Sequence, residues 1–389
     1  MASVQGVSED RFAELRKIFQ ERLNSGHELG ASITVNIDGK NVVDIWGGFA
    51  SADQPWEKDT IVNVWSSGKT ILSMAVLILV DRGLLDVDEN VAKYWPEFGT
   101  NGKENIKVRH LLSHTSGVSG WEQTLAEGDI YNREKVTSLL AEQSPWWEPG
   151  TASGYHPMTM GYLLSELVFR VTGKTISQFI NDEIAIPLKA DFQIGAKEAD
   201  WPRIASLEVK GLEPMTMPDG VPEFIIKTLK DMPKHPAIAM TPEWRTAEVA
   251  AGNGHGNSRA LSKIISAIAL GGEVDGVRLL KPETIDLIFQ QQSRGTDLIL
   301  GIDLQFGIGF AIRTAHDMAN LLLPGGRICF WGGLGGSIIV ADLERRMTFS
   351  YTMNQMYMKP GNGFLGNANT VEYGKAIYRA LGVTVGEEQ

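Results

Sequence analysis

The spacing of hydrophobic and polar residues predicts a helix and then a β hairpin at the start of the chain. Residues 8–10, Ser-Glu-Asp, place acidic groups where the helix would begin, and negative charge is favourable at that end of a helix dipole. Apolar residues then recur at helical spacing, namely Phe12, Leu15, Ile18, Phe19 and Leu23. Strand-like runs at 31–37 and 42–46 flank Asp38-Gly39, a dipeptide typical of tight hairpin turns.

The middle of the chain has the apolar spacing of helices. We expect helices at 70–85, 158–172 and 261–270. The stretch 189–242 is irregular and rich in proline and methionine, so we expect loops there that cover a cleft.

The end of the chain returns to strands. Three runs have the apolar content of strands: 327–330, 336–341 and 347–353. A closing helix is expected at 371–381, where Gly382 is a natural stop. Because β structure lies at both ends, we predict one α/β domain from 1–69 and 275–389, with a mainly helical domain inserted at 70–274.

The composition is that of an ordinary globular protein of 389 residues, with 43% hydrophobic and 21% charged residues. A net charge of −11 argues against nucleic acid and anionic membranes as partners, because both bind basic surfaces. The longest apolar run, 71–80, is about half of a bilayer span, and the N-terminus lacks the features of a signal peptide. Cys329 is the single cysteine, so no intrachain disulfide can form. We therefore expect a soluble, cytoplasmic protein.

The first candidate for chemistry is a Ser-x-x-Lys sequence, Ser66 to Lys69, at the start of the helix expected from residue 70. Residues three apart share one face of a helix, so the two side chains would be adjacent. A serine can lose its proton to a neighbouring lysine when burial lowers the pKa of that lysine. The alternative is a helix-capping serine beside a surface lysine.

Two further segments complete the candidates. Tyr155 lies between a Gly-containing turn at 148–154 and the helix expected from 158, so its hydroxyl could reach a cleft; the alternative is a packed aromatic residue. Residues 330–337, Phe-Trp-Gly-Gly-Leu-Gly-Gly-Ser, lead into an apolar strand. Glycines allow close approach of a ligand, and a strand amide there could donate to an oxyanion, although a bulge or bend is the alternative.

Together these segments resemble the serine β-lactamase and penicillin-binding protein superfamily, specifically its class C branch. Within it they match best the family VIII carboxylesterases and the acyltransferases that act on statin side chains. Further matching stretches are 111–117, 147–150 and 252–257. The resemblance covers nearly the whole chain and implies an α+β, β-lactamase/transpeptidase-like fold, with an antiparallel sheet flanked by helices and an inserted, mainly helical domain.

The resemblance also implies roles for individual residues. Ser66 would be the nucleophile, Lys69 its general base or the group that holds the proton balance of the tyrosine, and Tyr155 the shared acid/base that protonates the leaving alcohol. The backbone amides of Ser66 and Leu334 would form the oxyanion hole. Which of Lys69 and Tyr155 takes the serine proton stays open at this point.

The chain departs from the lactamase pattern at two places. Tyr155-His156-Pro157 stands where the pattern has Tyr-x-Asn, and Trp331-Gly332-Gly333 stands where it has Lys-Thr-Gly. The missing asparagine and lysine would contact the amide side chain and the carboxylate of a β-lactam, so we expect an ester or thioester substrate instead. Residues expected to contact this substrate are Trp331, Gly332, Gly333, Trp65 and His255.

We therefore predict a cofactor-free serine carboxylesterase that hydrolyses small or medium acyl esters and has no metal. The alternatives are an acyltransferase of secondary metabolism, a weak β-lactamase or D-aminopeptidase/amidase, and a binding or scaffold protein. His110 and His114 have the i,i+4 spacing of metal ligands but no obvious third partner, so a structural pair is expected. Residues 361–366 match G-x-G-x-x-G, which we interpret as a turn because too little chain follows for a dinucleotide-binding unit. Cys329 is expected to be a buried small hydrophobe.

Overall fold

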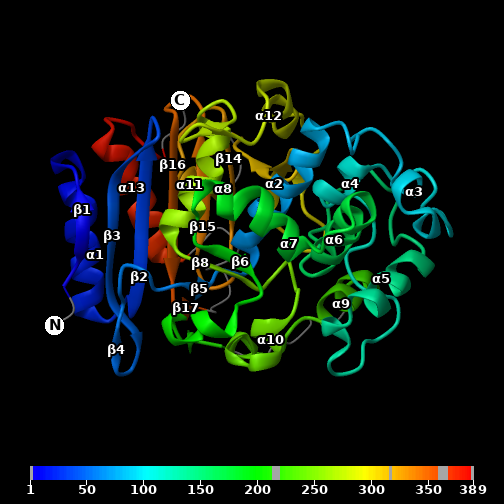
Figure 1. Cartoon of the computed structure of the whole chain (residues 1–389), viewed down its shortest axis with the longest axis horizontal. Coiled ribbons are helices and arrows are strands. Elements are labelled where there is room, and N and C mark those ends of the chain that lie inside the picture. The colour runs from blue at the N-terminus through cyan, green and yellow to red at the C-terminus, as the bar shows by residue number, and fades with distance from the viewer. Residues whose placement is uncertain (1–2, 213–219, 315–317, 358–366, 387–389) are drawn as a thin grey trace.

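The computed structural model describes residues 3–212, 220–314, 318–357 and 367–386, so the 361–366 turn lies outside the described residues. Strands from both ends of the chain form one antiparallel sheet (Figure 1). Across the sheet the order is β1 (Gln5–Ser8), β3 (Lys40–Ser51), β2 (Gly30–Ile37), β16 (Met347–Met353), β15 (Ile338–Asp342), β14 (Ile328–Gly332), β13 (Ala311–Ile312), β12 (Asp303–Phe306) and β11 (Ser293–Thr296). The two ends of the chain meet where β2 pairs with β16, with Val35 opposite Phe349. Together with the helices, this sheet confirms the α+β class.

The strand β16 illustrates how helices cover both faces of the sheet. Successive side chains of a strand point to opposite faces, and every residue of β16 is buried. On one face Tyr351 makes an edge-to-face contact with Tyr373 of α13 (Ala368–Ala380), and α1 (Ala13–Ser25) packs beside that helix. On the other face Ser350 shares a hydroxyl hydrogen bond of 2.8 Å with Ser262 of α11 (Ser258–Ala269). Residues 258–269 thus pack on the sheet, although they lie inside the range predicted for the helical insertion.

The helix predicted to begin at Ser8 is wrong at its start. Gln5–Ser8 form the edge strand β1, which pairs with β3, and the Glu9 amide still donates to the Val42 carbonyl of β3. The chain leaves the sheet only at a 3₁₀ turn that buries Phe12, and α1 follows from Ala13. The acidic residues Glu9 and Asp10 favour a helix start, but hydrogen bonds to an available sheet edge override that local preference.

The other predicted elements occur close to their expected places. The β2–β3 hairpin turns at Asp38 and Gly39, whose φ angles of 51° and 83° are those of the tight turn that Asp-Gly favours. The long apolar helix is α2 (Gly68–Asp81), which ends four residues earlier than predicted. It ends there because Gly83 adopts a φ of 69° and the amides of Leu84 and Leu85 donate back to Leu79.

The remaining elements are short, apart from α6. The helices are α3 (Val91–Tyr94), α4 (Val108–Leu112), α5 (Arg133–Glu142), α6 (Thr159–Thr172), α7 (Ile176–Ile180), α8 (Ile186–Leu188), α9 (Glu223–Lys230), α10 (Pro242–Thr246) and α12 (Pro282–Ile288). The short strands are β4 (Gln54–Pro55), β5 (Val62–Asn63), β6 (Phe192–Ile194), β7 (Glu208–Lys210), β8 (Gly254–Gly256), β9 (Glu273–Val274), β10 (Val277–Arg278) and β17 (Gln355–Tyr357). Hence the 189–242 stretch, expected to be loops, also holds β6, β7 and α9.

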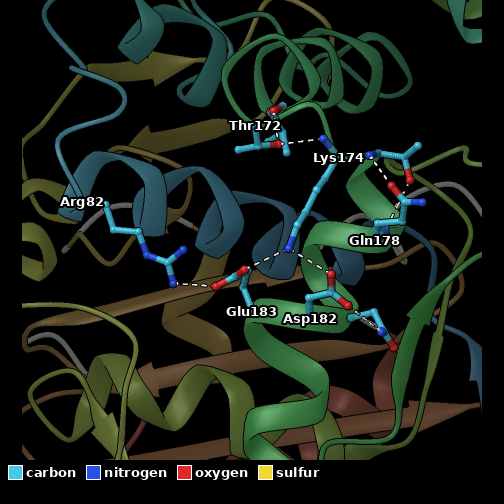
Figure 2. Close-up of polar contacts among 9 residues, drawn as sticks. Arg82, Thr172, Lys174, Gln178, Asp182 and Glu183 are labelled. Carbon is cyan, nitrogen blue, oxygen red and sulfur yellow. Dashed lines mark hydrogen bonds and ion pairs between the residues drawn. The ribbon is translucent and has the colours of Figure 1, made fainter.

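An ion-pair network lies at the C-terminal end of α2 (Figure 2). Arg82, which follows the last residue of α2, donates to Glu183 at 2.7 Å. Lys174 donates to the same carboxylate at 3.2 Å and to Asp182 at 3.0 Å. These contacts join α2 to the segment after α6. None of the described helices has the length and apolar character that crossing a bilayer requires.

Candidate active site

Ser66 and Lys69 lie at the start of α2, where the chain makes a constrained turn. A 3₁₀ turn, Trp65–Ser67, runs directly into α2. Trp65 has a φ of 50°, a left-handed conformation that a bulky residue rarely adopts and that is concentrated at functional sites. The Lys69 Nζ lies 2.9 Å from the Ser66 Oγ. The adjacency expected from the i,i+3 spacing is therefore present.

The Lys69 amine is enclosed by neutral groups. Only 2% of the residue is exposed, and its Nζ donates to the carbonyls of Pro157 and Ala251, each at 2.8 Å. Burial lowers the pKa of Lys69 well below its ordinary value. A carbonyl can only accept, so these two contacts use two N–H groups and leave the third position of the nitrogen facing Ser66. A neutral amine in this geometry can accept the proton of the serine.

Tyr155 is brought to the same place from the segment before α6. It is completely buried, and its ring centroid lies 5.2 Å from the Lys69 Nζ. The indole of Trp331 donates to the Tyr155 hydroxyl at 3.4 Å. Burial raises the pKa of Tyr155 above its ordinary value, although hydrogen bonds with Ser66 and Trp331 act in the opposite direction. The phenol is therefore protonated at neutral pH and can donate a proton.

The glycine-rich turn after β14 packs tightly against the start of α2. A Cβ on Gly333 would lie 2.3 Å from the Val64 carbonyl oxygen and 2.3 Å from the Ser337 hydroxyl, so only glycine fits at this position. The Ser337 hydroxyl donates to the same Val64 carbonyl at 2.9 Å. In the described loops and turns, neither the Ser66 amide nor the Leu334 amide donates to a backbone carbonyl. Their role as oxyanion donors stays a prediction.

This arrangement can be compared with known proteins. The Beta-lactamase family model matches residues 15–366. The chain belongs to the beta-lactamase family. It is 31% identical to Esterase/beta-lactamase LipL of Mycobacterium tuberculosis, over 97% of this chain and 90% of that protein.

Solved structures agree with this assignment. A family VIII carboxylesterase has a TM-score of 0.89 and 33% identity, with 97% of this chain and 100% of that chain covered. A penicillin-binding protein homologue from Caulobacter crescentus has a TM-score of 0.87 and 32% identity, with the same coverage. The β-lactamase-like fold and the superfamily resemblance are confirmed, and ester hydrolysis is an activity found in this superfamily.

Within this beta-lactamase-family fold, the residues expected to bind substrate differ in their surroundings. Trp331 is 3% exposed and lies against the Tyr155 ring, with centroids 5.1 Å apart. Gly332 ends β14 and pairs with Ile338. Trp65 packs its ring against Trp244 at 5.4 Å. Trp331 therefore belongs to the Ser66–Lys69–Tyr155 group, and a direct contact of any of these residues with substrate stays a prediction.

His255 lies apart from the Ser66–Lys69–Tyr155 group in the described contacts. It is the central residue of β8, opposite Asn63 of β5 and Gln193 of β6. Its Nδ1 lies 2.8 Å from the Asn253 carbonyl and therefore carries the ring proton. Burial lowers the pKa of His255 to about 4, so the ring is neutral at pH 7. Its role in binding a substrate stays a prediction.

The structure adds two residues that the sequence did not assign to the site. The ring of His114 lies 4.8 Å from that of Tyr155, and its Nδ1 accepts the His156 amide at 3.1 Å. Asp297, in the turn between β11 and β12, accepts the Tyr155 amide at 3.0 Å. The sequence singled out His114 only for its i,i+4 spacing with His110, which is that of metal ligands, and no sequence pattern indicated Asp297. In the described part of the chain, no three His, Cys, Asp or Glu residues are grouped as metal ligands.

Cys329 lies in β14 close to this group but does not take part in it. The residue is 1% exposed, and burial raises the pKa of its thiol above the ordinary value. A protonated, buried thiol is a poor nucleophile. The expectation of a buried small hydrophobe is confirmed.

Proposed function

We propose that the protein is a serine carboxylesterase that cleaves small or medium acyl esters through an acyl-enzyme on Ser66. One observation carries the proposal: the Lys69 amine, buried without a carboxylate among its described hydrogen-bond partners, lies 2.9 Å from the Ser66 hydroxyl. A lysine held in this way has the lowered pKa that a general base needs at neutral pH.

Acylation begins when the neutral Lys69 amine takes the hydroxyl proton and the Ser66 Oγ attacks the ester carbonyl carbon. The carbonyl oxygen becomes an oxyanion, which the Ser66 and Leu334 amides stabilise by hydrogen bonds. The carbon–oxygen bond to the alcohol then breaks, and Tyr155 donates its phenolic proton to the departing alkoxide. The proton on Lys69 passes to Tyr155 and restores both groups. The high pKa of the phenol and the low pKa of the amine favour Lys69 as the base and Tyr155 as the acid.

Deacylation repeats these steps with water as the nucleophile. Water attacks the acyl carbon and gives up a proton to the Lys69 amine. The bond from that carbon to the Ser66 oxygen then breaks, Tyr155 protonates the Ser66 oxygen, and the proton on Lys69 returns to Tyr155. The products are the carboxylic acid and free enzyme. An alcohol that enters in place of water gives acyl transfer by the same steps, so the acyltransferase alternative differs in the second nucleophile alone.

The surroundings of the tyrosine favour an ester over a β-lactam. Trp331 directs a neutral indole N–H to the Tyr155 hydroxyl, and the Pro157 carbonyl accepts from Lys69. Neither residue offers the charged group or the side-chain amide that would bind the carboxylate and the acylamino group of a β-lactam. An ester requires neither of these contacts.

The test combines a kinetic and a chemical measurement on wild type and Ser66→Ala. Wild type should hydrolyse p-nitrophenyl acetate and butyrate, and a fluorophosphonate probe should add its mass to the peptide that contains Ser66. Ser66→Ala should lose both properties, with unchanged far-UV circular dichroism. Turnover by Ser66→Ala at the wild-type rate would contradict the assignment of the nucleophile.

Two further measurements address the alternatives. Faster turnover of a chromogenic cephalosporin than of either ester would favour a β-lactamase. A wild-type protein that neither turns over an ester nor reacts with the probe would favour a binding or scaffold protein. Added alcohols that divert the acyl group from water would identify an acyltransferase.

A further inference from the structure

The turn between β11 and β12 places a buried carboxylate against the main chain of the catalytic tyrosine. Asp297 is completely buried. Its Oδ1 accepts three backbone amides, from Tyr155 at 3.0 Å, Ile299 at 3.0 Å and Leu300 at 2.9 Å. Two of these bonds shape the turn itself, and the third reaches a residue 142 positions earlier in the sequence. One oxygen therefore joins the shape of the turn to the position of Tyr155.

Further hydrogen bonds fix the main chain on both sides of the Tyr155 amide. The Ser153 carbonyl accepts the Leu298 amide at 2.8 Å, and the Gly154 amide donates to the His114 carbonyl at 2.9 Å. The His156 amide donates to the His114 ring at 3.1 Å. Without Asp297, the Tyr155 amide would be a buried donor without its acceptor, which destabilises a folded protein. We therefore expect the main chain at Tyr155 to shift when Asp297 is replaced.

The surroundings of the other oxygen of Asp297 indicate that the negative charge of the carboxylate has a function. Oδ2 is buried and has no hydrogen-bond partner among the described residues, an arrangement that a folded protein normally avoids. A neutral asparagine could supply the single acceptor oxygen without burying a charge. Burial is the main reason that the pKa of Tyr155 is raised, and the charge of Asp297 acts in the same direction.

Resting on the proposed function, we propose that Asp297 is a positioning residue: its carboxylate holds the main chain of Tyr155 so that the phenol lies beside Ser66 and Lys69. The charged and titratable groups around the phenol are Lys69 from α2, His114 and His156 from the segments beside it, and Asp297. Asp297 carries the negative charge in this set. It acts through Tyr155 and not through contact with substrate.

The decisive variant is Asp297→Asn, which keeps the shape of the side chain and one acceptor oxygen but removes the charge. A neutral amide oxygen holds the three backbone amides less tightly than a carboxylate does. The kcat of this variant on p-nitrophenyl acetate should therefore fall by about five- to twentyfold at a KM within about threefold of wild type, because a small displacement of a catalytic group costs rate and not ground-state binding. Asp297→Ala, which also removes the acceptor, should lose about 10²-fold in kcat or more. The rate of fluorophosphonate labelling at Ser66 should fall in the same order.

Asp81→Asn is the matched control. Asp81 also accepts a backbone amide, that of Lys281 at 2.6 Å, but it is the last residue of the 14-residue helix α2. It therefore lies about 20 Å along the helix from the Ser66 end. The Asp81→Asn variant should have a lower melting temperature than wild type, as Asp297→Asn does, and a kcat within about twofold of wild type. A purely structural role would lower stability in both variants and kcat in neither.

The outcomes separate the two proposals. A kcat of Asp297→Ala within twofold of wild type would overturn the positioning role. A loss that appears in KM alone would overturn it as well. Failure of Ser66 to react with the probe in wild type would instead overturn the proposed function, whatever the Asp297 variants do.

Discussion

Basic side chains lie in opposite surroundings beside the two ends of α2. At the N-terminal end, Lys69 of α2 is 2% exposed and is bonded to carbonyls and a hydroxyl, whereas the second lysine, Lys174, comes from the segment after α6 and lies beside the C-terminal end of α2. At the C-terminal end, Lys174 is 38% exposed at its side chain and bonded to the carboxylates of Asp182 and Glu183 (Figure 2). Burial lowers the pKa of Lys69, whereas the hydrogen bonds that Lys174 donates to Asp182 and Glu183 raise the pKa of Lys174.

The comparison shows that hydrogen-bond partners and exposure to water set the pKa of a lysine, and so determine whether it can act as a base. The partly positive end of the helix dipole disfavours a cation beside Ser66 and favours an oxyanion there, and the opposite end favours the cations of the network. Neutral partners cannot compensate for the removal of an ammonium group from water. The first environment therefore supports proton transfer at the expense of stability, and the second stabilises charged groups at the surface.

The largest expected effect is that of Lys69→Met. Without a base next to Ser66, kcat should fall by about 10³-fold. The melting temperature should stay the same or rise, because the variant no longer buries an amine that favours water. Ester turnover and a thermal melt on the same preparation would test both. A melting temperature well below that of wild type would show that Lys69 contributes to stability, and the contrast with Lys174 would fail.

Gly333→Ala tests the close packing of the glycine-rich turn against the N-terminal end of α2. Its Cβ would lie 2.3 Å from the Val64 carbonyl oxygen, so the turn that carries the Leu334 amide must move away from Ser66. We expect a loss of about 10²-fold in kcat, the size associated with one oxyanion donor. Gly325→Ala, in the same glycine-rich stretch but with open space around its Cβ, should keep wild-type kcat. Equal rates in the two variants would contradict the role of the turn.

The pH dependence follows from the lowered pKa of Lys69. The amine is a base only after it loses its proton, so kcat/KM should rise with pH by about tenfold per pH unit and level off above the pKa. Because burial moves that pKa below the ordinary 10.5, the plateau should begin well below pH 10.5. Rates corrected with Ser66→Ala as a blank would measure it. A rate that is flat from pH 5 to pH 9 would mean that the amine is already neutral at pH 5.

The smallest expected effect is that of Lys174→Met at the other end of α2. Exposed ion pairs contribute little, and Arg82 still pairs with Glu183 in the variant. We expect the melting temperature to change by less than about 2 °C, with an unchanged pH profile of kcat/KM. A change in that profile would mean that the network influences Lys69 through the helix, and the two ends could no longer be treated as independent.

Much of the fold followed from local patterns, and the exceptions have physical reasons. The Asp38-Gly39 hairpin, the core of α2 and the strands 347–353 occur where apolar spacing and turn chemistry predict them. The start of the first helix was wrong because the exposed edge of β3 offered Gln5–Ser8 hydrogen bonds that no local pattern encodes. The end of α2 was missed because Gly83 forms a helix-ending turn before the apolar residues that follow it.

The candidate site divides in the same way. The sequence by itself determined that Ser66 and Lys69 are neighbours, because three residues span nearly one helical turn. It also specified a glycine at position 333, the one residue without a Cβ to clash there. The tertiary structure alone brought the carbonyls of Pro157 and Ala251 to the Lys69 amine, across 88 and 182 positions of chain, and brought Asp297 to the Tyr155 amide across 142 positions. It also buried the amine of Lys69, and the pKa of a lysine depends on the water and the partners that the folded chain leaves around it.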